Sequence, residues 1–114
     1  MSSIVPNQMP EVIEGYLKAH KAREIDSALG RYTIDATVTD EGRTYVGPNE
    51  IRAWLSRSAS EFTYSIELVG AAKVGEDKYD VMHRLEGNFP GGKVDLHYRF
   101  TLRDGKIAQL VIEE

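Results

Sequence analysis

The chain has 114 residues and a formal charge of −4, with 41% hydrophobic and 28% charged residues. These values are ordinary for a globular protein, and the length fits one domain with its own core. The absence of cysteine excludes disulfides, thiol nucleophiles and cysteine-based metal sites, and the mildly acidic charge argues against a nucleic-acid surface.

The first ten residues are polar and contain two prolines, Pro6 and Pro10. They lack the basic start and apolar centre of a signal peptide, and no apolar run in the chain approaches membrane-spanning length. We therefore expect a cytoplasmic protein without membrane contact, in which residues 1–9 are a lead-in segment and residues 10–114 are a single domain.

Two helices are predicted first. The spacing of apolar side chains predicts an amphipathic helix over residues 9–22, with His20 at the edge of the apolar stripe, where we expect a structural role. A second, shorter helix is predicted from about Asp26 to Tyr32, and Gly30 weakens it.

The stretch from Tyr32 to Gly42 changes from helical to alternating character. Its predicted strand places Ala36, Val38 and Asp40 on one face. Partial burial raises the pKa of a carboxylate, and a general base needs a pKa near neutrality. Asp40 is therefore a candidate general base. The alternative is that it opens a solvated hairpin turn, as Asp and Gly often do.

Residues 43–46 are predicted to return as the hairpin partner of this strand. The Gly-Pro-Asn sequence of residues 47–49 then stops the hairpin, and its asparagine is a suitable N-cap for a third helix. On that helix Ile51, Trp54 and Leu55 share one face, and we expect Trp54 to pack against the sheet.

Apolar and polar residues alternate in four runs from Phe62 to the end of the chain. The runs lie in residues 62–68, 79–86, 94–102 and 106–112, with turns at residues 75–77, 90–92 and 103–105. Each run has one apolar and one polar face, which is typical of an antiparallel sheet covered on one side. The order helix, helix, hairpin, helix and four strands predicts an α+β cone whose mouth can hold a ligand.

The order of elements and three local motifs resemble the nuclear transport factor 2-like superfamily, in particular its SnoaL-like and ketosteroid-isomerase-like branch. The motifs are Asp35-Ala36-Thr37-Val38-Thr39-Asp40, the Gly47-Pro48…Ile51 helix start and the Tyr98-Arg99-Phe100…Asp104-Gly105-Lys106-Ile107 hairpin. The resemblance covers the chain from about Pro10 onward. It implies a cone-shaped, strongly curved and mostly antiparallel sheet with three N-terminal helices enclosing a pocket, also described as a cystatin-like α+β roll. It implies no single function, because this fold hosts enzymes as well as non-catalytic binding modules.

The ketosteroid isomerases of this branch imply roles for single residues. Their general base closes an Asp-Ala-Thr-Val-x-Asp run, where this chain has Asp40. Their oxyanion-hole tyrosine lies on the first helix, in a context that Tyr16 matches, and a supporting tyrosine precedes the run, as Tyr32 does here. Their second oxyanion donor is a protonated aspartate, but this chain has Leu96 or, in another register, His97 at that position. The loss of one donor costs roughly 2.7–4 kcal/mol of transition-state stabilisation, so efficient steroid-type isomerisation is disfavoured.

His83 interrupts an apolar face between Val81 and Leu85. It is a core histidine, a second acid/base, or a hydrogen-bond donor that replaces the missing one. The predicted ligand-binding residues are Tyr32, Trp54, Tyr64, Leu96 and Tyr98. The three histidines show no metal-ligand spacing, and no nucleotide-binding or serine-hydrolase signature occurs, so we expect neither a metal nor a cofactor.

Two functions remain open. In the first, a SnoaL-like pocket protein binds an apolar or ring-containing small molecule and acts as a cofactor-independent isomerase or cyclase, in which Asp40 removes a proton next to a carbonyl and Tyr16 stabilises the oxyanion. In the second, the same fold is a non-catalytic ligand-binding or dimerisation module whose cavity is filled by aromatic side chains. The resemblance also implies a homodimer formed through the polar face of the sheet. The outward-facing residues there are Arg84, Asp95, His97 and Arg99.

Overall fold

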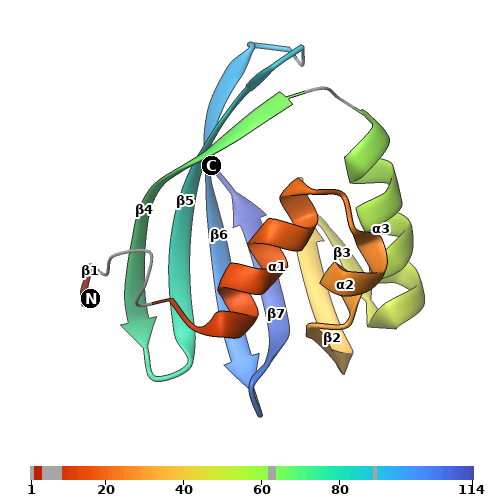
Figure 1. Cartoon of the computed structure of the whole chain (residues 1–114), viewed down its shortest axis with the longest axis vertical. Coiled ribbons are helices and arrows are strands. Elements are labelled where there is room, and N and C mark those ends of the chain that lie inside the picture. Colours follow the sequence, from red (N-terminus) through yellow and green to blue (C-terminus); the bar gives the residue numbers. More distant parts are fainter. Residues whose placement is uncertain (1, 4–8, 62–63, 89) are drawn as a thin grey trace.

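The computed structural model describes residues 2–3, 9–61, 64–88 and 90–114, with the backbone alone for residues 2–3, 58–61 and 64. Within these residues, three helices lie along one side of a curved seven-stranded sheet (Figure 1). The helices are α1 (Glu11–Lys21), α2 (Ile25–Leu29) and α3 (Gly47–Glu61). The strands are β1 (Ser2–Ser3), β2 (Tyr32–Asp40), β3 (Arg43–Val46), β4 (Tyr64–Gly75), β5 (Lys78–Gly87), β6 (Lys93–Arg103) and β7 (Lys106–Glu113). None of the described helices is long and apolar enough to cross a membrane.

The strands form one open sheet in the order β1-β4-β5-β6-β7-β2-β3. The predicted antiparallel meander of β4 to β7 and the predicted β2–β3 hairpin are confirmed. β2 also pairs with β7 in parallel, with Asp40 beside Ile112, a pairing that was not predicted. This pairing joins the two halves of the chain into the predicted α+β cone, so the predicted fold is confirmed.

The predicted second helix is wrong at its C-terminal end. α2 stops at Leu29, and Tyr32 is already the first residue of β2. The backbone amide of Ile107 donates to the carbonyl oxygen of Arg31 at 2.9 Å, so β7 pairs with the chain where the helix would have continued. Gly30 favours the same outcome, because glycine is a poor helix former.

β2 is longer than predicted and changes register after Tyr32. Without this irregularity, Ile34 would share the core face of Tyr32, Ala36 and Val38. Instead Ile34 is 84% exposed, while the other three side chains are buried. Asp40 keeps the face that the alternation predicts, in line with Ala36 and Val38, which directs it toward the interior of the cone.

α3 begins at Gly47, before the predicted cap at Asn49. The φ angle of Gly47 is 82°, a conformation that glycine adopts without strain. The predicted apolar face of this helix is buried, with Ile51, Trp54 and Leu55. The predicted start of the next strand at Phe62 lies outside the described residues.

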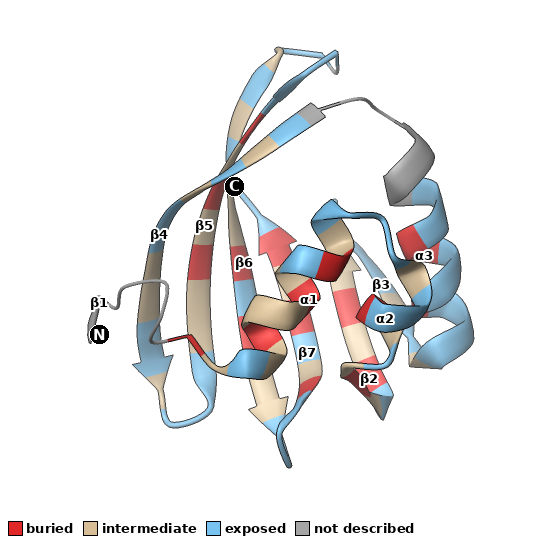
Figure 2. Ribbon diagram, in the orientation of Figure 1, coloured by how far each residue is buried: buried red, intermediate tan, exposed pale blue. Residues whose placement is uncertain are grey.

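The core lies between the helices and the inner face of the sheet, where the buried positions gather in Figure 2. Its largest fully buried side chains come from α1, α3, β6 and β7 and are Tyr16, Phe100, Ile13, Ile51, Ile107 and Leu110. Burying one such side chain contributes about 1.5–3 kcal/mol. The amphipathic patterns of the helices and strands therefore hold the cone together.

The polar residues on the outer face of β5 and β6 form ion pairs within the chain. Arg84 pairs with Asp95 and Arg99 with Glu113, and His97 forms a hydrogen bond with Asp80. Pairs as exposed as Arg84–Asp95 contribute little to stability. The role of this face in a homodimer remains a prediction.

A close contact between α1 and the α2–β2 connection involves Gly15 and Arg31. A Cβ atom on Gly15 would overlap with the guanidinium carbon of Arg31. Glycine therefore makes room for this guanidinium, which lies 3.9 Å from a carboxylate oxygen of Glu11.

Gly15→Ala should gain little stability in the native chain, although glycine to alanine in a helix interior stabilises by about 1 kcal/mol. In an Arg31→Ala chain the guanidinium is gone, and we expect the full gain. Urea unfolding of the four chains in a double-mutant cycle measures the difference, expected at about 1 kcal/mol. Equal effects of Gly15→Ala in both backgrounds would show that Arg31 does not pack on this glycine.

Candidate functional site

A cavity of about 730 Å³, here called the main cavity, opens at the end of the cone where β2, β3, α3 and β5 to β7 meet. Its apolar and aromatic wall includes Tyr45, Trp54, Leu85, Val94, Leu96 and Tyr98. Its polar groups include His20, Asp40, Arg57 and Glu113. The volume and the mixture of apolar surface with few polar groups are typical of a small-molecule site.

Asp40 is the last residue of β2 and lies on the wall of the main cavity, half-buried. The indole Nε1–H of Trp54 donates to its Oδ2 atom at 3.0 Å. This bond connects α3 with β2 and fixes the orientation of the carboxylate. The turn of the hairpin itself is made by Glu41 and Gly42, so Asp40 has a defined partner rather than a purely solvated position.

Tyr16 and Tyr32 form a hydrogen-bonded pair in the core. The hydroxyl of Tyr32 donates to the hydroxyl oxygen of Tyr16 at 2.6 Å, and Tyr16 is fully buried. Burial and the nearby phenols of Tyr16 and Tyr98 raise the pKa of Tyr32 well above its usual value. Of these three tyrosines, Tyr98 is the one that lines the main cavity.

His20 lines the main cavity as well, although the sequence suggested only a structural role. Its ring stacks on Tyr16 with centroids 5.9 Å apart and on Trp54 with centroids 6.1 Å apart. Burial lowers the pKa of His20, so its imidazole is neutral near pH 7. The signal for this position was its spacing of four residues after Tyr16, which places both rings on one helix face.

His83 is buried between Val81 and Leu85, as the alternation predicts, and is 4% exposed. Its ring packs edge-on against Tyr98 with centroids 4.7 Å apart, and its Nδ1 atom has no hydrogen-bond partner within the described part of the chain. Burial, with a smaller effect of His20, lowers the pKa of His83 to about 4. It lies in the core and is not one of the residues that line the main cavity.

The predicted site residues thus fall into two groups. Those on the wall of the main cavity are Asp40, Trp54, Leu96 and Tyr98. Those in the adjoining core are Tyr16, Tyr32 and His83. The side chain of Tyr64 lies outside the described residues. Across the described side chains, no three histidine or carboxylate groups come close enough to hold a metal ion.

Comparison with known proteins identifies relatives of this chain. The sequence profile of a family described as "SnoaL-like domain" matches residues 13–110. No curated protein matches. Among solved structures, a candidate polyketide cyclase from Sinorhizobium meliloti is 31% identical with a TM-score of 0.89, and the match covers 96% of this chain and 100% of that chain.

Two further structures share the fold at lower identity. A protein of ketosteroid isomerase-like fold from Catenulispora acidiphila, in complex with trimethylamine, is 18% identical with a TM-score of 0.80, over 94% of this chain and 87% of that chain. The protein TerC, co-crystallised with polyporic acid, is 20% identical with a TM-score of 0.77, over 96% and 91%.

The buried His83 predicts a loss of stability in acid. Its pKa is about 4 in the folded chain against an ordinary 6.5, so the unfolded chain binds more protons between these values. Above about pH 6.5 the histidine is neutral in the folded and the unfolded chain, and its burial costs no protonation energy. As the pH falls toward 4 only the unfolded chain is protonated, and up to roughly 3 kcal/mol of stability is lost.

Urea unfolding of the native chain and of His83→Leu, at several pH values between 7 and about 4, measures this loss. We expect the stability of the native chain to fall more steeply with decreasing pH than that of His83→Leu, because the variant lacks the group that must stay neutral. Parallel curves would show that another group causes the acid sensitivity.

Proposed function

The chain belongs to the SnoaL-like domain family of the nuclear transport factor 2-like superfamily, and on this premise we propose that its main cavity binds an apolar, ring-containing small molecule with a carbonyl group. The aromatic and aliphatic wall suits such a ring system, and the few polar groups can orient it. The relatives support this proposal, since one is a candidate polyketide cyclase and another was co-crystallised with polyporic acid.

We propose further that Asp40 is the general base of a cofactor-independent isomerisation or cyclisation. The observation that carries this proposal is the Asp40 carboxylate on the wall of an apolar cavity, held by the indole of Trp54. In the proposed step a proton leaves the carbon next to the carbonyl and moves to Asp40. The electron pair of that C–H bond moves toward the carbonyl oxygen, and the proton returns at another carbon in an isomerisation.

Tyr16 is our proposed oxyanion donor. Tyr32 donates to the Tyr16 oxygen, and such a bond polarises the O–H of Tyr16 and makes it a stronger donor. Tyr98 lies close enough to Tyr32 to affect its pKa and also lines the main cavity, and the ring of His83 packs edge-on against Tyr98. Leu96 supplies no second donor, which limits the rate enhancement that this site can reach.

The alternative is a non-catalytic ligand-binding or dimerisation module. It is favoured by the apolar Leu96 at the position of the second donor and by the complete burial of Tyr16. In this alternative Asp40 and Trp54 shape the cavity and recognise the ligand without proton transfer. A homodimer through the outer face of β5 and β6 is compatible with both functions.

A bicyclic ketone, 2-tetralone, tests the proposed function. Because Trp54 is the only tryptophan and lines the main cavity, its fluorescence should report binding. In D₂O the protein should accelerate deuterium exchange next to the carbonyl, as measured by ¹H NMR. We expect Asp40→Asn to reduce this acceleration by at least about 100-fold, because general base catalysis contributes factors of 10²–10⁴, while binding persists.

Asp104→Asn is the matched control, since it removes an exposed carboxylate in the β6–β7 turn and should leave the exchange unchanged. Tyr16→Phe should slow the exchange without abolishing binding, because it removes only the proposed donor. Binding without acceleration would support the non-catalytic alternative. If 2-tetralone neither binds nor exchanges faster, the proposal loses its support for this ligand class.

A further inference from the structure

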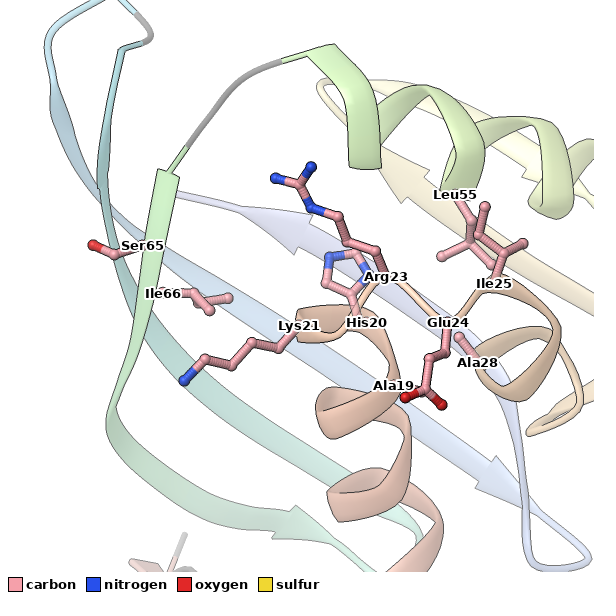
Figure 3. Close-up of a pocket in the computed structure, with 10 residues that line it drawn as sticks. All are labelled: Ala19, His20, Lys21, Arg23, Glu24, Ile25, Ala28, Leu55, Ser65 and Ile66. Atoms are coloured by element: carbon pink, nitrogen blue, oxygen red, sulfur yellow. The ribbon is translucent and has the colours of Figure 1, made fainter.

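A second hollow of about 220 Å³ lies on the other side of His20 and is here called the side pocket (Figure 3). It is enclosed by the end of α1, by α2, by α3 and by the start of β4. Its apolar wall includes Ile25, Leu55 and Ile66, and its basic residues are Lys21 and Arg23. The volume is below the range of about 300–1,000 Å³ for drug-sized ligands, so an occupant must be small.

Arg23 occupies a backbone position that normally favours glycine. α1 ends with the amide of Arg23 donating to the His20 carbonyl oxygen at 3.1 Å and that of Glu24 donating to the Ala19 carbonyl oxygen at 2.8 Å. In this helix ending the residue at the Arg23 position adopts a left-handed conformation, and its φ angle is 60°. An arginine there costs stability relative to glycine. The arginine side chain is thus the feature that distinguishes this helix ending from one that ends in glycine.

The side chain of Arg23 lines the side pocket. Figure 3 shows it passing His20, with the guanidinium directed away from the carboxylate of Glu24, while Lys21 extends toward β4. Burial keeps His20 neutral near pH 7, so the charged groups of this pocket are Arg23, Lys21 and the carboxylate of Glu24, from which the Arg23 guanidinium points away. A guanidinium next to an apolar wall matches a carboxylate that carries a short hydrocarbon chain.

We propose that the side pocket is a second binding site, which holds a short aliphatic carboxylic acid with its carboxylate at Arg23 and its alkyl chain against Ile25, Leu55 and Ile66. This proposal does not depend on catalysis by Asp40 or on a ligand in the main cavity. It gives the arginine at a glycine-favouring position a role in recognition.

Hexanoate and hexan-1-ol, titrated into isotope-labelled protein and followed by NMR, test the proposal. We expect hexanoate to perturb the methyl resonances of Ile25, Leu55 and Ile66 in a saturable manner. Hexan-1-ol, with the same chain but no charge, should bind at least about fivefold more weakly. A bound carboxylate should also raise the pKa of His20, because a nearby anion favours the imidazolium form.

Arg23→Gly separates recognition from folding. We expect it to weaken hexanoate binding about fivefold to tenfold and at the same time to raise the thermal midpoint by about 3–6 °C, because it relieves the left-handed backbone. Asp104→Gly is the matched control, since Asp104 has a φ angle of 54° in the distant β6–β7 turn. It should raise the midpoint without changing hexanoate binding.

The proposal is overturned if hexanoate does not bind, if hexanoate and hexan-1-ol bind equally well, or if Arg23→Gly leaves hexanoate binding unchanged. These outcomes are independent of the exchange assay with 2-tetralone, which reports on Asp40 in the main cavity.

Discussion

A continuous row of aromatic contacts connects the core of this protein with both of its hollows. Tyr32 donates to Tyr16, the ring of Tyr16 stacks on His20, His20 stacks on Trp54, and Trp54 donates to Asp40. The row joins α1, α3 and β2, which are distant in sequence. It therefore sets the position of the Asp40 carboxylate, and one of its members, His20, lines both the main cavity and the side pocket.

Burying histidines in this interior lowers stability at acidic pH. An imidazole in an apolar setting must stay neutral, and the pKa values of both His20 and His83 are lowered by burial. A leucine at either position would avoid this cost. In exchange, His20 gives both hollows a polar group to which a ligand can hydrogen-bond. Leu96 on the wall of the main cavity is apolar and offers no such group.

The sequence predicted what depends on local pattern. Alternation placed Ala36, Val38 and Asp40 on one face, and helical spacing placed Ile51, Trp54 and Leu55 together, because side-chain direction follows directly from the period of each element. The parallel β2–β7 pairing was missed, since no turn or short spacing connects those strands. The end of α2 was missed for the same reason, because the partner that ends it is Ile107, far along the chain.

In the candidate site, too, local pattern predicted which residues matter but not the contacts between them. Asp40 and Trp54 were both singled out from the sequence, yet their hydrogen bond depends on how α3 crosses β2, which local pattern does not specify. His20 was assigned to the edge of a helix stripe. Its importance comes from two rings that meet it, Tyr16 one turn earlier and Trp54 on another helix, and only the second of these required the folded chain.

His20 lines both the main cavity and the side pocket, so ligands at the two proposed sites would share this imidazole as a neighbour. A carboxylate in the side pocket would favour the charged form of His20, because the anion offsets part of the desolvation that keeps the imidazole neutral. The main cavity would then gain a charged N–H donor on its wall. Leu96 cannot supply such a donor, and a developing oxyanion requires one. By linkage, an anionic ligand in the main cavity would strengthen the binding of a proton at His20 in the same way, so the occupancy of each hollow affects the other through a single imidazole.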